Sequence, residues 1–242
     1  QAKTEEQQKK NIALLFDMIR MSSEMNSNYE KLKQMQTEGG AFVWFTGGPA
    51  NRYITQYIIT GIGHLKKLGV NVEKLSPIIN DAISYLDKEI KKDYEDLKKN
   101  KTDLTKYFPA YDNLQYLYMR SFFTDKKIEA ESQTAYNYFR RRVQQTWTKQ
   151  SKYMQAMIAL MLYRTGDAKT ANAILLSLKE TSINNEELGR YWKENSGGWF
   201  WHQAPIETQA LLIEAFSEIN KDVTTVVELK TWLLKNKQTK NW

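Results

Sequence analysis

The sequence contains no cysteine, only two histidines and only four prolines. Without cysteine, the chain can form no disulfide, no thiolate metal site and no cysteine nucleophile. Two histidines are too few for a three-histidine zinc site, and no metal-ligand spacing surrounds them. No apolar run approaches the ~18 residues of a membrane span. We therefore expect no metal, no cofactor and no direct membrane span.

The net charge of +7 does not come from one basic segment. Lysines alternate with acidic residues, as in the stretch DKEIKKDYEDLKKNK at 87–101, and the densest purely basic cluster is Arg140, Arg141 and Arg142. Solvated helix faces explain this pattern better than a nucleic-acid surface does. We expect no nucleic-acid partner.

The few prolines and glycines separate long segments whose apolar residues recur at helical spacing. No convincing strand alternation is present. Pro77 and Pro205 suit first helical turns, and Asp125, Asp167 and Asp222 are possible N-caps. The predicted helices are 5–36, 52–66, 77–99, 111–123, 126–149, 152–165, 168–181, 204–219 and 223–237.

Four predicted helices are apolar around most of their circumference, and each carries a glutamine at the second position of its apolar segment. These residues are Gln56, Gln115, Gln155 and Gln209. Such helices are buried on all sides, whereas the helices between them carry one apolar stripe and a charged face. The alternation predicts stacked α-hairpins in one all-α domain over residues 1–242. An open solenoid and an α/α toroid both fit, and the uniformly apolar inner helices favour the toroid.

This arrangement predicts burial residue by residue. We expect the inner residues Ile58, Leu117, Ile158 and Leu212 to be almost fully buried. We expect the outer residues Lys92, Lys99 and Lys179 to be exposed.

Two stretches repeat a pattern of Gly-Gly, aromatics, then Thr-Gln and an apolar run. They are GGAFVWFTGGPANRYITQYIITGIGHL at 39–65 and GGWFWHQAPIETQALLIEAF at 197–216. Glycines let the backbone adopt positive φ, so each stretch predicts a tight loop that leads into an inner helix. The aromatics of the loops are expected to cover the mouth of the ring. They are Phe42, Trp44, Phe45, Trp199, Phe200 and Trp201.

Four segments carry a resemblance to a known family. They are GGAFVWFTGG at 39–48, RYITQYIITGIGHLKKLGV at 52–70, WFWHQAPIETQALLIEAF at 199–216 and ELKTWLLKNKQTKNW at 228–242. These segments resemble bacterial alpha-2-macroglobulin-family proteins of the Bacteroides type. The resemblance lies in their complement-like thioester-domain region and runs from about residue 5 to the end. It implies a terpenoid-cyclase-like α/α toroid within a larger multidomain protein of the cell envelope, periplasmic or surface-exposed. It also implies two kinds of partner: other domains of the parent protein, and the proteases that this protein traps.

One feature departs from the family pattern. The family's thioester joins a cysteine to a glutamine in a Cys-X-Glu-Gln-like motif, and this chain has no cysteine. Glu5, Glu6 and Gln7 are no substitute, because they lie at a polar helix start. The chain is expected to be either a fragment cut after the motif, since it begins at Gln1, or a member that traps by shape alone. In both cases it is expected not to be an enzyme, with no catalytic, cofactor-binding or metal-binding residue.

A glycan-cleaving toroid, either a hydrolase or a lyase, is the alternative. Asp112, Glu194 and Glu207 could supply its paired acids, with Trp44, Trp199 and Trp201 as stacking platforms. Packing of these tryptophans between helix ends is the simpler interpretation, because a fold alone does not imply an activity.

Histidine and tyrosine side chains also have simple structural interpretations. His202 could act as a base with Glu207 or Glu194, although a structural role is favoured, and His64 suits a helix C-terminus. The clustered tyrosines are interpreted as core and rim. They are Tyr107, Tyr111, Tyr116 and Tyr118.

Overall fold

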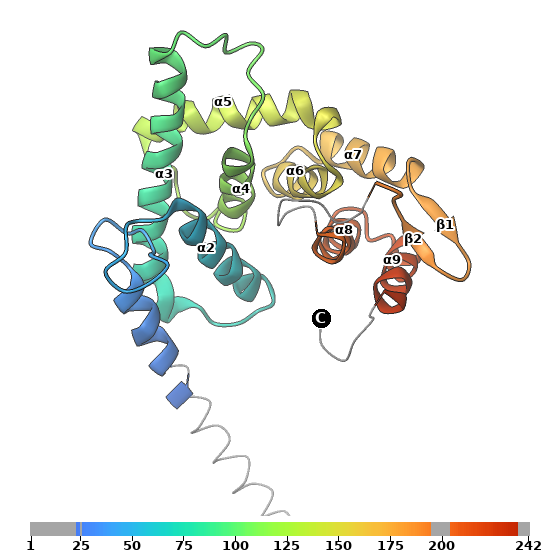
Figure 1. Cartoon of the computed structure of the whole chain (residues 1–242), viewed down its shortest axis with the longest axis horizontal. Coiled ribbons are helices and arrows are strands. Elements are labelled where there is room, and N and C mark those ends of the chain that lie inside the picture. Colours follow the sequence, from blue (N-terminus) through green and yellow to red (C-terminus); the bar gives the residue numbers. More distant parts are fainter. Residues whose placement is uncertain (1–22, 25, 195–203, 237–242) are drawn as a thin grey trace, which may run out of the picture.

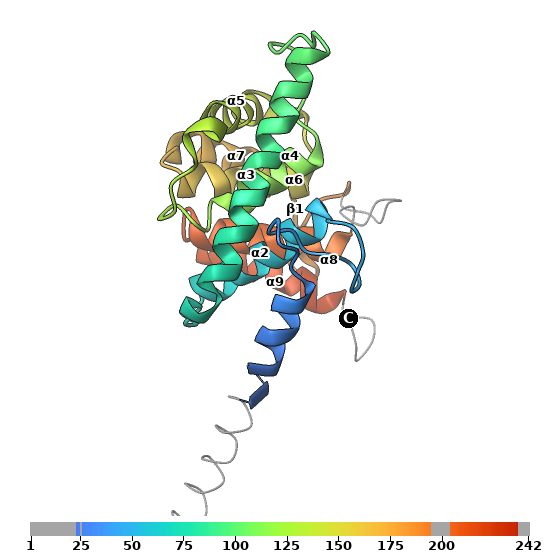
Figure 2. The ribbon, with the colours of Figure 1, turned by 90° about the vertical axis from the view of Figure 1, so that its left-hand side faces the viewer.

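A computed structural model describes residues 23–24, 26–194 and 204–236, and this part of the chain is almost entirely helical. Residues 26–35 form a helix that extends from the body of the molecule (Figure 2). The remaining elements are α2 (Arg52–Lys67), η1 (Glu73–Leu75), α3 (Ser76–Lys99), α4 (Tyr111–Arg120), α5 (Ala130–Thr146), η2 (Trp147–Lys149), α6 (Lys152–Arg164), α7 (Ala168–Glu180), β1 (Ile183–Asn185), β2 (Gly189–Tyr191), α8 (Pro205–Glu218) and α9 (Val223–Lys235). The all-α prediction is confirmed.

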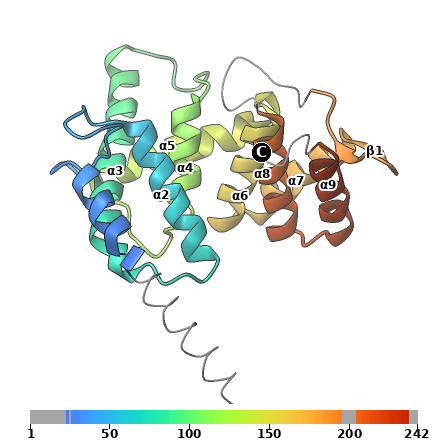
Figure 3. The ribbon, with the colours of Figure 1, turned by 60° about the horizontal axis from the view of Figure 1, so that its bottom comes forward.

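The helices alternate between an inner and an outer layer. The inner helices α2, α4, α6 and α8 pack side by side in that order, and α3, α5, α7 and α9 lie outside them (Figure 1). The outer helices α3 and α9 lie at opposite ends of the resulting arc (Figure 3). Four helical pairs therefore follow one another along the arc, and closure into a toroid stays a prediction.

Burial is most complete in the middle of the inner layer. Every residue from Asn113 to Arg120 in α4 and from Gln155 to Leu162 in α6 is buried. Leu117, Ile158 and Leu212 are at most 2% exposed, as predicted. Ile58 is only half-buried, because α2 turns Ile59 and Ile62 into the core instead. The inner assignment of α2 is right, but its rotation was predicted about one residue out of phase.

The four glutamines tie the inner helices to their surroundings. Gln56 Nε2 donates to Gln115 Oε1 at 3.2 Å and so joins α2 to α4. Gln155 donates to the carbonyl of Gln150, and Gln209 donates to the carbonyls of Arg190 and Leu229. These hydrogen bonds join the inner helices to one another or to neighbouring segments, and most buried polar groups are bonded in this way.

The outer helices expose their charged faces. Lys92 and Lys99 of α3 are exposed, as predicted. Lys179 of α7 is partly covered, because its Nζ lies 2.5 Å from the Asp222 carboxylate. That carboxylate also accepts from the amide of Thr225 and caps α9.

Two of the three predicted aspartate caps are confirmed. Asp167 and Asp222 accept hydrogen bonds from the third residue of α7 and of α9. The third prediction is wrong, because α5 begins at Ala130 and Asp125 pairs with Lys66 at 2.7 Å instead. Pro77 and Pro205 lie in the first turns of α3 and α8, as predicted.

The first Gly-Gly-aromatic loop is anchored to the inner layer rather than laid over it. Phe42 is fully buried, and its amide donates to Thr55 Oγ1 at 2.8 Å at the start of α2. Gly40 has a φ of 88°, and a Cβ there would lie 2.2 Å from the Asp81 carbonyl oxygen. Trp44 and Phe45 are 62% and 65% exposed, so Phe42 is the only aromatic residue of this loop that packs inward. Trp199, Phe200 and Trp201 lie outside the described residues.

The short antiparallel hairpin β1–β2 was not predicted. Its strands are only three residues long and β1 is wholly exposed, so no alternating pattern marks them. Gly189 begins β2 with a φ of 77°, against the backbone of α9.

Gly189→Ala is expected to lower the stability of the fold by more than the cost of placing an alanine at positive φ. An added Cβ would lie 2.2 Å from the Glu228 carbonyl oxygen and 2.9 Å from Trp232 N. Positive φ costs an alanine roughly 1–2 kcal/mol, and the displaced backbone adds to that cost. Gly166→Ala is the matched control, because Gly166 has a φ of 91° and no atom within 4 Å of the added Cβ. Urea denaturation should show the larger loss for Gly189→Ala, and equal losses would contradict the close packing.

Candidate functional site

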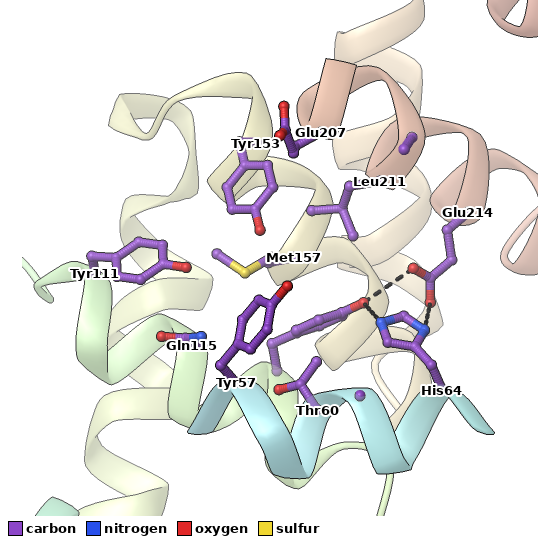
Figure 4. Close-up of a pocket in the computed structure, with 13 residues that line it drawn as sticks. Tyr57, Thr60, His64, Tyr111, Gln115, Tyr153, Met157, Glu207, Leu211 and Glu214 are labelled. Carbon is purple, nitrogen blue, oxygen red and sulfur yellow. Dashed lines mark hydrogen bonds and ion pairs between the residues drawn. The ribbon is translucent and has the colours of Figure 1, made fainter. Parts of the chain in front are cut away.

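The concave side of the arc holds a pocket of about 380 Å³ to which all four inner helices contribute. Its lining residues are Tyr57, Thr60, Gly61, His64, Tyr111, Gln115, Tyr118, Tyr153, Met157, Glu207, Ala210, Leu211 and Glu214. Figure 4 shows their side chains converging on a common space. Pockets of this size, mainly apolar with a few polar groups, are typical of ligand sites.

The helix sequences explain how these residues meet. Tyr57, Thr60, Gly61 and His64 recur at three- and four-residue spacing, which places them along one face of α2. Glu207, Ala210, Leu211 and Glu214 repeat that spacing on α8. Gly61 has no atom near its missing Cβ and leaves the pocket open at this point, whereas Gly63 abuts the ring of Phe122 on the core side.

One end of the pocket is closed by a network of hydrogen bonds and ion pairs (Figure 4). The Tyr118 hydroxyl donates to Glu214 Oε2 at 3.1 Å and lies 3.4 Å from His64 Nε2. Arg164 holds Glu214 at 2.6 Å and Glu218 at 2.7 Å. Lys67 of α2 also pairs with Glu218 of α8, so the first and last inner helices are joined here.

Burial sets the protonation of this end. Burial lowers the pKa of His64, and the nearby Arg164 and Lys67 lower it further against the opposing effect of Glu214. Burial, then repulsion from Arg164, lowers the pKa of Lys67 to about 8. Burial, followed by the charge of Glu214, raises the pKa of Tyr118 well above its usual value. At neutral pH the network therefore contains a neutral imidazole, a neutral phenol and paired charges.

The pKa of His64 gives a prediction for stability against pH. Its folded value lies below the unfolded value of about 6.5, so the neutral form is favoured in the fold. The associated stability is present above that unfolded value and is lost as pH falls through the folded pKa.

We therefore expect His64→Gln to lose less stability than the parent chain between about pH 6.5 and pH 5. Urea denaturation of both proteins across this range measures the difference. A steeper loss in His64→Gln than in the parent chain would contradict the assignment.

The other end of the pocket is aromatic. Tyr57, Tyr111 and Tyr153 surround it, with Glu207 at its edge (Figure 4). Burial raises the pKa of Tyr153 to about 12, and burial likewise raises the pKa of Tyr111 far above its usual range. Both phenols stay protonated at neutral pH and present neutral rings and hydroxyl groups.

The acid set predicted for a glycan-cleaving site is not assembled. Glu207 lines the pocket, whereas Asp112 and Glu194 are exposed and do not line it. The other carboxylate of the pocket, Glu214, lies two helical turns from Glu207, or about 10 Å along α8. Paired glycosidase carboxyls lie roughly 5–9.5 Å apart, and Arg164 already neutralises Glu214.

The other residues considered in the sequence analysis do not contribute to the pocket where the structure describes them. Tyr116 is buried and donates to Asp87, and Tyr107 donates to Asn113. Trp44 does not line the pocket. His202, Trp199 and Trp201 lie outside the described residues, as do Glu5, Glu6 and Gln7. Within the described part no cluster of three or more metal-ligating His, Cys, Asp or Glu residues occurs, and no helix there combines the length and apolarity needed to cross a bilayer.

Sequence reasoning missed the pocket itself. Tyr111 and Tyr118 were assigned to core and rim, and Tyr57 and Tyr153 were not singled out. The sequence contains one indication of the pocket: each predicted inner helix carries polar or aromatic residues on the side that faces the centre of the arc. These residues predict a pocket only when the spatial order of the inner helices is known, because that order decides which helix faces meet.

Comparison with known proteins gives a partial structural similarity. No protein-family model matches the chain, and no curated protein matches it. Among solved structures, the native conformation of E. coli alpha-2-macroglobulin matches 86% of this chain at 19% identity, with a TM-score of 0.49. The match covers 12% of that protein's chain. At this level the similarity concerns the course of the chain and assigns no activity.

Proposed function

We propose that this chain is a non-enzymatic helical domain of an alpha-2-macroglobulin-like protein that traps proteases. The proposal starts from the resemblance of residues 39–48, 52–70 and 199–216 to that family. Its main support is the contacts of the first two of these segments: the Phe42 amide donates to Thr55, and Gln56 donates to Gln115. The residues that carry the resemblance therefore hold loop and helix together, as expected of a domain that acts through its shape.

The finer parts of the proposal follow from the resemblance. The domain corresponds to the thioester-domain region of the Bacteroides type, forms all or part of an α/α toroid, and resides in the cell envelope, periplasmic or surface-exposed. Its partners are the other domains of the parent protein and, through that protein, target proteases. The chain itself can form no thioester, because it lacks cysteine.

The isolated chain is expected to link covalently to no protease and to cleave no glycan. Covalent capture needs an activated acyl group, and the chain has no thiol with which to form one. Incubation with proteases should give no linked product on a denaturing gel, and a polysaccharide panel should give no new reducing ends.

Two outcomes would contradict the proposal. A covalent protease adduct of this cysteine-free chain would overturn the mechanism. Glycan cleavage that disappears in Glu207→Gln but persists in Glu187→Gln, an exposed control near the hairpin turn, would establish the alternative enzyme.

A further inference from the structure

The aromatic end of the pocket has the chemistry of a cation site. The rings of Tyr57, Tyr111 and Tyr153 and the carboxylate of Glu207 border one space (Figure 4). Aromatic faces attract ammonium and guanidinium groups, and groups of such rings form cages for them. Glu207 forms no ion pair within the described part of the chain, so its charge is available to a ligand.

The charge of the pocket contrasts with that of the chain. The chain carries a net charge of +7, yet the pocket lining includes two glutamates and no lysine or arginine. The positive charges at the closed end belong to Arg164 and Lys67, and both are paired with Glu214 or Glu218. The charge of Glu207 is one of the causes that raise the pKa of Tyr153, which indicates a negative potential at this end.

A buried amide provides a second recognition element. Gln115 lines the pocket and is 4% exposed. Its oxygen accepts from Gln56, but its amide nitrogen has no hydrogen-bond partner within the described part of the chain. A donor held in this way favours a ligand with an acceptor such as a carbonyl oxygen.

Exposed aromatic rings extend the site along α2. Tyr57 stacks on Tyr53 at a centroid distance of 6.2 Å, and Tyr53 stacks on Trp44 at 6.3 Å. Tyr57 and Trp44 are 61% and 62% exposed. This row leads from the Gly-Gly loop into the pocket, so a ligand longer than one residue can lie on it.

We propose that this pocket binds a basic side chain, arginine or lysine, of a peptide segment. Glu207 and the tyrosine rings hold the cation, Gln115 donates to a peptide carbonyl, and the Trp44–Tyr53–Tyr57 row supports neighbouring residues. The inference goes beyond the proposed function and does not depend on it, because it rests on the pocket alone.

The test uses the chain labelled with ¹³C at its methionine methyl groups. Met157 lines the pocket, whereas Met119 is buried in α4 and does not line it, so the two methyl groups serve as reporter and internal reference. The probes are Nα-acetyl-arginine amide and its uncharged analogue Nα-acetyl-citrulline amide, together with the neutral sugar cellohexaose. The arginine probe should shift the Met157 signal with a Kd of roughly millimolar, and the citrulline probe should bind far more weakly.

Variants of the pocket residues test whether the arginine probe binds in the pocket. Glu207→Gln should weaken binding of the arginine probe about tenfold or more, and Tyr57→Ala should weaken it severalfold. Both residues are exposed, so neither change disturbs the core. Glu95→Gln on the outer helix α3 removes the same charge elsewhere and should change nothing, because Glu95 lies outside the pocket.

Three results would overturn the proposal. Equal binding of the arginine and citrulline probes would exclude cation recognition. So would arginine binding that Glu207→Gln leaves unchanged. Binding of cellohexaose, with no arginine response up to about 20 mM, would assign the pocket to a polyhydroxyl ligand instead.

Discussion

Arg120→Met is expected to lower the free energy of unfolding by roughly 3–5 kcal/mol, because it leaves a buried charge without its partner. Arg120 of α4 and Asp87 of α3 have side chains that are 2% and 1% exposed, with Nε 3.1 Å from Oδ1. The guanidinium also donates to the carbonyls of Phe123, Lys126 and Lys127. The substitution therefore separates an inner helix from an outer one and releases the connection that follows α4.

The effect of Arg120→Met should depend on pH. Burial raises the pKa of Asp87, and Arg120 opposes that shift most strongly. Without Arg120 the folded pKa rises further, so the protonated, neutral form stabilises the fold at low pH and this contribution is lost as pH rises through that pKa. The loss caused by the variant should be smaller near pH 4 than at pH 7.

Urea denaturation at the two pH values checks this prediction. Arg141→Met is the matched control, because Arg141 is exposed on α5, and it should change stability by less than about 0.5 kcal/mol. Adding Asp87→Leu should recover part of the loss, since replacing both charges with apolar groups removes the unpaired one. A loss that is equal at both pH values would contradict a buried charge as its cause.

Ile158→Ala is expected to cost roughly 2–5 kcal/mol by leaving a cavity. Ile158 is 2% exposed near the middle of α6, which packs against α4, α7 and α8. The side chains around Ile158 are fixed by the helices that carry them, so they cannot move far enough to fill the cavity that the substitution leaves. The cost should fall near the upper part of the range.

Leu176→Ala on the outer helix α7 is the control for this cavity. Leu176 is 58% exposed, so its truncation should cost less than about 1 kcal/mol. Denaturant midpoints of both variants measure the difference. A cost below about 1 kcal/mol for Ile158→Ala would contradict the inner position of α6.

The layering of the helices could be predicted because its causes are local. Apolar residues around most of a segment's circumference identified α4 and α6 as inner helices, and Asp167 and Asp222 marked the starts of α7 and α9. Asp125 had the same local signature but pairs with Lys66, which is distant in the sequence. A distant partner does not by itself prevent capping, because Asp222 pairs with Lys179 and still caps α9. Asp125 fails as a cap because α5 begins only at Ala130.

The hairpin and the pocket depend on contacts between distant segments. β2 is held against α9, and the glycine at 189 is explained by its φ of 77° together with its close approach to Glu228. The pocket combines Tyr57, Tyr153 and Glu207 from three helices. The glycan-cleaving alternative grouped Glu207 with Asp112 and Glu194, whereas the fold places Glu207 beside tyrosines. Residue types alone could not supply that arrangement.

Under the proposal this chain is one domain of a larger parent protein, and the most direct test of that central claim is a trapping assay on such a parent. An enclosed protease should lose activity on large protein substrates and keep activity on small peptide substrates, because the enclosure excludes by size. The protease should lose much less activity on large substrates when the parent carries Arg120→Met, because this substitution destabilises the domain. A parent carrying Arg141→Met is the control. Under the proposal, covalent protease adducts are expected only if another segment of that parent supplies the Cys and Gln of the thioester motif. Unchanged cleavage of large substrates by proteases mixed with the intact parent would contradict a protease-trapping role for this domain.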